Sequence, residues 1–249
     1  MSKLEKIGSE IWVAEGPSIT FLTMRITTRA TVVRLSDGTI WLHSPVKYER
    51  ALANEISKLG AVRFLIAPNI YHHLFVGEWQ RHFPEAELLA APGLASKRSD
   101  LNFGRTLGHE TASAWPDEIE QILFTGSRAF DEFIFFHRPS STAILTDLIV
   151  NIRAEHQTLL GRCVARIEGV TYPRGRTPLL YRLAMKDKML AAAAISDLLA
   201  FAPDAAVISH GEWFRENATD ELRQRFSWLP LRPPLRKETG RPLPTQSSL

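Results

Sequence analysis

Residues 40–91 alternate between short apolar runs and segments with helical spacing, and this alternation restricts the possible folds most strongly. The runs at 40–43, 62–67 and 87–91 are short and mostly apolar, as expected for buried strands. Residues 48–59 carry apolar side chains at helical spacing and end at Gly60, which favours a helix stop. Strand, helix, strand, helix, strand is the pattern of a parallel α/β unit, so we predict an α/β fold with some antiparallel strands, the mixed α+β arrangement.

Two β-rich blocks lie on either side of this unit, and the first of them ends with the unit's first strand. In the first, strands are predicted at 11–14, 19–26, 30–35 and 40–43, with breaks at Gly16-Pro17 and a hairpin turn at Asp37-Gly38. In the second, strands are predicted at 119–124, 131–137 and 142–151, and the runs 133–136 and 143–145 form an antiparallel hairpin. A short helix is predicted at 92–97, and 102–113 shows no clear period and is assigned to a loop.

The C-terminal part is mainly helical. Residues 186–201 predict a helix, 205–209 a short buried strand, and Thr219 with the two acidic residues after it marks another helix start. The tail at 230–249 is rich in proline, arginine and serine, which predicts disorder. We therefore expect one domain over residues 1–229 and a disordered basic tail at 230–249.

Composition excludes several classes of protein. A formal charge of +3 over 249 residues is too small to imply nucleic acid as a partner, and the single cysteine, Cys163, excludes an intrachain disulfide and a cysteine-rich zinc site. No apolar run is long enough for a membrane span, and the first ten residues lack the apolar core of a signal peptide. We expect a cytoplasmic protein with no membrane partner; the sequence does not define the oligomeric state.

Polar side chains that can bind a metal come at the ends of four apolar runs, 40–42, 62–67, 143–146 and 205–209. They are His43, the pair His72-His73, Asp147 and His210. Side chains at strand ends gather at one edge of a sheet, and imidazole with carboxylate suits zinc, iron or manganese, which lower the pKa of bound water. A structural interpretation remains open for each: the His72-His73 pair as surface or hydrogen-bonded residues, Asp147 as a loop cap, His210 as a satisfied core histidine, and His43 as a group that hydrogen-bonds a neighbour without touching metal.

The order of these elements resembles the metallo-β-lactamase fold superfamily. The segments that carry the resemblance are PNIYHHLF, FFHRPSSTAILTDLIVN and the late ISHG, and they are also similar to an uncharacterised family of that superfamily, a domain of unknown function. The resemblance spans roughly residues 8–229 and implies a four-layer αββα sandwich with a metal site along one edge between the sheets.

The superfamily's metal motif is only partly present. Its H-x-H-x-D-H run falls on Pro68, Ile70, His72 and His73, so two histidines are absent and histidine stands in the aspartate position. The resemblance then implies one divalent ion held by His72, His73, Asp147 and His210. His137, in a run that echoes another ligand motif, is excluded because it lies at a hairpin turn one strand, about 17–20 Å, from Asp147. The slot for that ligand falls near Ser127 or Arg128.

Two functions follow as hypotheses. The first is a single-metal hydrolase acting on an ester, amide or thioester of an unidentified small molecule, with Asp147 and His43 as catalytic residues and His43 orienting or relaying a proton. The second is a binding or interaction protein that keeps the fold and has lost the metal site. A weaker third hypothesis is nucleic-acid processing, supported only by the basic tail.

Overall fold

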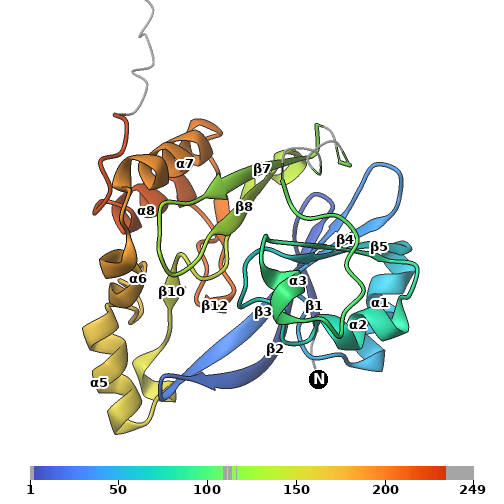
Figure 1. Ribbon diagram of the computed structural model, residues 1–249, viewed down its shortest axis with the longest axis horizontal. Coiled ribbons are helices and arrows are strands. Elements are labelled where there is room, and N and C mark those ends of the chain that lie inside the picture. The colour runs from blue at the N-terminus through green and yellow to red at the C-terminus, as the bar shows by residue number, and fades with distance from the viewer. Residues whose placement is uncertain (1–2, 109–110, 112–113, 116, 234–249) are drawn as a thin grey trace, which may run out of the picture.

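The structure is a computed structural model that describes residues 3–108, 111, 114–115 and 117–233 (Figure 1). It contains two principal sheets that pack face to face, with helices on their outer faces. This is the predicted four-layer αββα sandwich. Of the predicted tail, residues 234–249 lie outside the described residues, as do 109–110 and 112–113 of the predicted loop. The single-domain organisation over residues 1–229 stays a prediction.

The first sheet has six strands in chain order, antiparallel from β1 to β4 and parallel from β4 to β6. The strands are β1 (Leu4–Gly8), β2 (Ile11–Phe21), β3 (Met24–Arg34), β4 (Ile40–His43), β5 (Val62–Ala67) and β6 (Glu87–Ala90). The helices of this half are α1 (Arg50–Leu59), α2 (Val76–His82) and α3 (Leu94–Lys97). The predicted helices at 48–59 and 92–97 are confirmed, whereas α2 begins beyond the histidine pair, which therefore lies in the preceding turn.

The second sheet has four strands in the order β11-β9-β8-β7, and a short two-stranded sheet joins β10 to β12. The strands are β7 (Ile119–Phe124), β8 (Glu132–His137), β9 (Thr142–Ile144), β10 (Val150–Asn151), β11 (Ala205–Val207) and β12 (His210–Gly211). The helices are α5 (Leu159–Glu168), α6 (Leu179–Ala184), α7 (Lys188–Ala200) and α8 (Ala218–Arg225), with 3₁₀ turns at Arg138–Ser140 and Ala154–His156. The β8–β9 hairpin and the helix at 186–201 match the predictions.

Alternation of side chains along the strands assigns them to the layers. In β8, Phe133 and Phe135 enter the core between the two sheets, whereas Ile134 and Phe136 enter the core beneath α7 and α8. In the first sheet, Trp41 faces the other sheet while its neighbours face α1 and α2. Because successive strand residues point to opposite faces, a nearly continuous apolar strand can serve two cores at once.

The long β2–β3 hairpin corrects one prediction. Residues 19–26 were expected to form one strand, but the chain turns at Leu22-Thr23, where both residues have positive φ. Gly16-Pro17, expected to be a break, is instead a bulge within β2, where the pairing with β3 shifts register between Gly16 and Ile19. The tip of this hairpin extends away from the sheet towards α5 (Figure 1).

Among the described residues, no helix has both the length and the apolar character needed to cross a membrane.

Candidate metal centre

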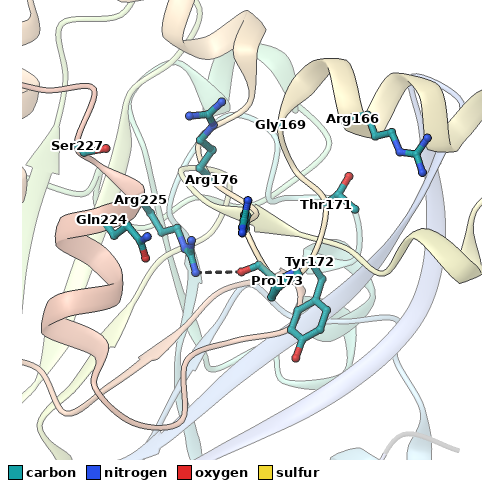
Figure 2. A pocket seen from close by; sticks show the side chains of 10 residues that line it. Arg166, Gly169, Thr171, Tyr172, Pro173, Arg176, Gln224, Arg225 and Ser227 are labelled. Atoms are coloured by element: carbon teal, nitrogen blue, oxygen red, sulfur yellow. Dashed lines mark hydrogen bonds between the residues drawn. The ribbon is translucent and has the colours of Figure 1, made fainter.

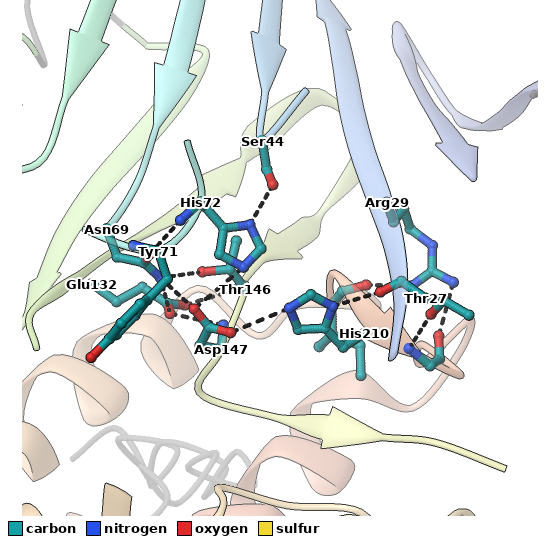
Figure 3. A network of polar contacts seen from close by, with 12 residues as sticks. Thr27, Arg29, Ser44, Asn69, Tyr71, His72, Glu132, Thr146, Asp147 and His210 are labelled. Carbon is teal, nitrogen blue, oxygen red and sulfur yellow. Dashed lines mark hydrogen bonds and ion pairs between the residues drawn. The ribbon is translucent and has the colours of Figure 1, made fainter. Parts of the chain in front are cut away.

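Three of the predicted polar residues lie together at one edge between the sheets (Figure 3). His72 comes from the turn after β5, Asp147 from the loop after β9, and His210 from β12. His72 Nε2 lies 3.3 Å from Asp147 Oδ2, and His210 Nε2 lies 3.3 Å from Asp147 Oδ1. One ligand atom of each residue lies within 4.8 Å of the others. Asp147 thus stands between the two imidazoles.

The hydrogen bond of His210 fixes which of its ring nitrogens carries a proton. Nδ1 lies 2.6 Å from the Thr27 carbonyl oxygen, which only accepts, so Nδ1 is the donor. In the neutral ring the Nε2 lone pair then faces the Asp147 carboxylate, and two acceptors 3.3 Å apart repel one another. A proton or a cation between them removes that repulsion. This backbone carbonyl behind a ligand histidine is also the usual outer partner of a metal-bound imidazole.

The separations fit a small divalent ion. Ligand atoms about 2.0–2.1 Å from a tetrahedral zinc ion stand about 3.3–3.4 Å apart. Each imidazole nitrogen lies 3.3 Å from one oxygen of Asp147, His72 from Oδ2 and His210 from Oδ1, and one ligand atom of each of the three residues lies within 4.8 Å of the other two. Two nitrogens and an oxygen are also a donor set that zinc, iron and manganese accept. The three residues therefore fit a mononuclear centre with room for further ligands.

β3 holds the strand that carries His210. Arg29, which is 5% exposed, donates to the carbonyl oxygens of Ile208 and Gly211, the latter at 2.8 Å, and also bonds Glu15. Thr27 Oγ1 accepts the Gly211 N–H at 2.8 Å. Gly211 has φ +90°, and a Cβ there would lie 2.1 Å from the Asn151 carbonyl oxygen, so only glycine fits after His210.

Asn69 connects the turn that carries His72 to Asp147. Its Oδ1 accepts the N–H groups of Tyr71 at 2.8 Å and His72 at 2.9 Å, and its Nδ2 donates to Asp147 Oδ2 at 2.8 Å (Figure 3). On the far side of the ring, His72 Nδ1 meets the hydroxyl of Ser44. Ser44 therefore holds the Nδ1 side of the His72 ring and Asn69 holds its backbone, and neither residue was among the predicted site residues.

Glu132, at the start of β8, lies beneath the centre with no exposed surface. Its carboxylate accepts the N–H of Thr146 at 2.7 Å and of Asp147 at 2.9 Å, and Asn69 Nδ2 lies 3.1 Å away. Burial, and then the charge of Asp147, raise the pKa of Glu132 to about 7. Glu132 therefore fixes the loop that carries Asp147. Ser127 and Arg128, where the slot of the missing ligand falls, pair instead with the end of α6: the Arg128 N–H donates to the Ala184 carbonyl oxygen at 3.1 Å, and Ser127 forms a β-bridge with Met185.

The electrostatics favour an ionised Asp147. Burial opposes the charged form, but the neighbouring His72 and His210 outweigh it and hold the pKa of the Asp147 carboxyl well below its usual range. An anionic carboxylate between two imidazoles is suited to hold a cation.

His73 does not join this group, which corrects the four-ligand prediction. Its Nδ1 lies 2.9 Å from a guanidinium nitrogen of Arg98, and burial, then Lys97 and Arg98, lower the pKa of His73 to about 4. The turn that points His72 at Asp147 directs the next side chain towards α3 and the segment after it. Because the positive charges of Lys97 and Arg98 lie beside His73, a metal cation would be repelled from this place.

His43 is also placed differently from the prediction. Its ring stacks on Trp41 at 5.3 Å, lies edge-on to Phe135, and makes no hydrogen bond to any described residue. Burial, and then His72, hold the pKa of His43 well below its usual range. Because alternate strand residues share a face, His43 follows Trp41 between the sheets, and Ser44 contacts His72 instead. A proton relay through His43 is therefore not supported.

His137 lies where the hairpin argument put it. Its Cα pairs with Thr142 at the closed end of the β8–β9 hairpin, opposite to the end that leads to Asp147. Nδ1 lies 2.7 Å from the Ser140 hydroxyl. It plays no part in the candidate centre.

A cavity of about 170 Å³ opens on the centre. Most of its lining is apolar, and the residues are Ile19, Phe21, Ile26, Thr28, Ser44, Pro45, Tyr71, His72, Leu74, Phe75, Asp147, Tyr181 and His210. A second cavity of about 80 Å³, also lined by Asp147, Tyr181 and His210, lies between the hairpin tip and α6. Tyr181 therefore borders both spaces. Burial, and then the charge of Asp147, raise the pKa of its phenol, so it remains a hydrogen-bond donor.

Comparison with known proteins agrees with this architecture. A metallo-β-lactamase from Pontibacter korlensis is 14% identical, with a TM-score of 0.58 over 91% of this chain and 98% of that chain. The metallo-β-lactamase FIM-1 from Pseudomonas aeruginosa in its mono-zinc form is 11% identical, with a TM-score of 0.59 over 91% and 95%. A metallo-β-lactamase from Hirschia baltica is 14% identical, with a TM-score of 0.57 over 91% and 96%. At such identities the likeness concerns the fold alone.

Sequence comparison identifies the family. No curated protein matches the chain. A family model described as a domain of unknown function, DUF4336, matches residues 9–166. The chain therefore belongs to the DUF4336 family, and it has the metallo-β-lactamase fold.

Proposed function

We propose that this protein is a mononuclear metal-dependent hydrolase that cleaves an ester, amide or thioester bond next to a small apolar acyl group. The observation that carries the proposal is the opposition of His210 Nε2 and Asp147 Oδ1 at 3.3 Å, with Nδ1 already committed to the Thr27 carbonyl. That arrangement calls for a cation or a proton, and His72 adds a further nitrogen within 4.8 Å.

The donor set indicates what a bound ion contributes. His72, Asp147 and His210 would hold it, and a divalent ion there supplies Lewis acidity that polarises a carbonyl group and lowers the pKa of water. Asn69 fixes the backbone of His72, Ser44 bonds its ring, and the Thr27 carbonyl oxygen holds the ring of His210, so the ligands need no rearrangement.

The remaining steps belong to the residues of the cavity. The apolar side chains of β2, β3 and the turn after β5 would take up the acyl group and exclude water. The protonated phenol of Tyr181 would donate a hydrogen bond to the carbonyl oxygen or the leaving group. Asp147, whose pKa is held well below its usual range, is a weak base and would act as a ligand of the ion. The small volume favours short acyl chains.

The proposal is tested by metal analysis together with turnover. The purified protein, stripped and then dialysed separately against zinc, manganese and iron(II), should retain about one ion per chain. His210→Ala should retain far less, whereas His156→Ala, which changes an exposed histidine remote from the centre, should match the wild type. Wild type should hydrolyse short-chain p-nitrophenyl esters or acyl thioesters, and His210→Ala should not.

Two outcomes contradict the proposal in different ways. If no ion rebinds, the metal centre is excluded. If one ion binds tightly but no ester, amide or thioester is cleaved, the second hypothesis, a binding protein on this fold, is the better description.

A further inference from the structure

Another cavity, which is lined mainly by polar residues and shares no residue with the metal centre, lies between the connection from α5 to α6 and the end of α8 (Figure 2). Its volume is about 700 Å³, within the range of small-molecule sites. The lining residues are Arg166, Gly169, Thr171, Tyr172, Pro173, Arg174, Arg176, Gln224, Arg225 and Ser227. We call it the arginine cavity. None of the three candidate metal ligands lines it.

Four of these ten residues are arginines, and none is acidic. Arg166, Arg174 and Arg176 are exposed, and within the described part of the chain none of their side chains forms an ion pair or hydrogen bond. Surface arginines elsewhere in the molecule commonly have a carboxylate partner, such as Arg105 with Glu87 and Arg138 with Glu120. The arginine cavity therefore concentrates positive charge that the described acidic residues leave uncompensated.

Arg225 gives the cavity a fixed wall. It is 8% exposed and donates to the Pro173 carbonyl oxygen at 3.0 Å, which ties α8 to the turn (Figure 2). Within α8 it also forms an ion pair with Glu221. Its Nε is buried and has no hydrogen-bond partner among the described residues, and the same holds for the hydroxyl oxygen of Thr171. Buried donors without a partner are rare, and both of these atoms belong to residues that line the cavity.

A purely structural role explains only part of this cluster. Arg166 and Arg225 occupy the last turns of α5 and α8, where cations stabilise a helix dipole. Arg174 and Arg176 belong to no helix. Their charge must therefore be explained by something other than helix termini.

The turn that carries Arg174 and Arg176 is anchored from behind. Gly175, between them, is buried, its N–H donates to Asn151 Oδ1 at 3.0 Å, and a Cβ there would lie 2.3 Å from the Val150 carbonyl oxygen. The Arg174 N–H donates to the Thr171 carbonyl oxygen at 3.0 Å and so closes the turn. The packing thus holds the backbone while both arginine side chains stay exposed.

We propose that the arginine cavity binds a small molecule that carries a phosphate or diphosphate group. Planar guanidinium groups bind phosphate oxygens through paired hydrogen bonds, and Arg174, Arg176 and Arg225 come from two elements that enclose one space. Tyr172, 43% exposed, lies at the same wall; the Arg153 guanidinium covers one face of its ring at 4.6 Å from the centroid, and the opposite face would take the organic part of such a ligand.

The test is calorimetric titration of the full-length protein with inorganic pyrophosphate and with ADP, in a chelator-free buffer near physiological salt. Wild type should bind both saturably. The double variant Arg174→Gln/Arg176→Gln should bind about tenfold or more weakly, because charge-assisted hydrogen bonds are lost. Arg50→Gln is the matched control: this exposed arginine at the start of α1 forms no ion pair with any described residue, so its removal should change affinity less than about twofold.

A further arm separates this site from the metal centre. Pyrophosphate can also bind to a metal ion, so His210→Ala protein should keep the wild-type affinity for pyrophosphate. Thermal melts of each variant establish that the protein is folded. The inference is overturned if neither probe binds saturably, if Arg50→Gln weakens binding as much as the double variant, or if His210→Ala abolishes it. It is also overturned if a single-stranded oligonucleotide binds more tightly than ADP with an affinity that grows with its length, which would mark a nucleic-acid surface.

Discussion

The candidate metal centre and the arginine cavity differ in whether, among the described residues, their charged side chains are buried and paired or exposed and unpaired. At the centre, Asp147 is 7% exposed, and both carboxylate oxygens have partners from different parts of the chain. In the arginine cavity, Arg166, Arg174 and Arg176 are exposed, and the structure gives their side chains no partner among the described residues. Burying a charge without a partner is costly, whereas an exposed guanidinium remains hydrated until a ligand arrives.

The difference indicates how each region recognises its ligand. The centre is preorganised by a buried network, so its ligands are fixed before an ion binds and affinity depends on the network. In the cavity the backbone at Gly175 and the side chain of Arg225 are fixed, whereas the exposed side chains of the other three arginines close on whatever anion enters. The predictions below test whether this division is correct.

The largest expected effect is on folding, from Glu132→Ala. This change removes the acceptor for the N–H groups of Thr146 and Asp147 and for the Asn69 amide, all buried. A buried donor without a partner costs about 1–3 kcal/mol, so we expect a loss of about 3 kcal/mol or more in the free energy of unfolding, measured by urea denaturation. Arg174→Ala, in the exposed cavity, is the control and should cost less than about 0.5 kcal/mol. Equal losses would show that the two regions do not differ.

The next effect concerns a buried histidine outside both regions. Burial lowers the pKa of His137 to about 4, against about 6.5 in the unfolded chain. Because the unfolded chain takes up the proton more readily, the stability that neutral His137 contributes is complete above pH 6.5 and is lost as the pH falls towards 4. The loss is at most about 3 kcal/mol.

Denaturation curves at pH 7.5, 5.5 and 4 of wild type and His137→Asn isolate this contribution. The stability difference between the two proteins should shift in favour of the variant as the pH falls. His156→Asn, an exposed histidine, should follow the wild type at every pH. A difference that is constant with pH would mean that the His137 ring is not kept neutral by burial.

These cases also show what the sequence can and cannot predict. The strand ends that carry polar groups were predicted because apolar runs and turn residues are local signals. Which of two neighbouring residues faces the site was not predicted: β4 is buried on both faces, so its sequence does not show that His43 faces the second sheet and that Ser44, just after it, faces His72. The same uncertainty affected His72 and His73, whose directions depend on the hydrogen bonds of Asn69.

Long-range assemblies were harder still. Glu132 was one carboxylate among many in the sequence, and only the pairing of β8 with β9 places it beneath Asp147. The arginine cavity unites residues from α5, the following turn and α8, which share no motif or spacing. The rule that functional groups follow buried strands predicts at which edge of the sheet the site lies. The tertiary structure is needed to show which side chains meet there.

A smaller effect is expected on metal affinity from Asn69→Ala. The side chain touches no ion in the proposed centre, but it fixes the turn of His72 and one oxygen of Asp147. Loss of such an outer partner commonly weakens metal binding about 10–100-fold. Competition with a zinc chelator measures it, and Asn102→Ala, on the exposed segment after α3, is the control. An unchanged affinity would remove Asn69 from the preorganised network.

The smallest effect, and the most direct comparison of the two regions, is the dependence on salt. Exposed charges are screened with a Debye length of about 8–10 Å near physiological ionic strength, whereas buried ones are screened much less. Raising sodium chloride from about 50 to 300 mM should therefore weaken pyrophosphate binding to the arginine cavity several-fold. Zinc affinity, measured by chelator competition in parallel, should change less than about twofold after correction for the chelator's own salt dependence. If zinc binding proves as salt-sensitive as pyrophosphate binding, the ion is held at the surface, because only an exposed site would be screened in this way.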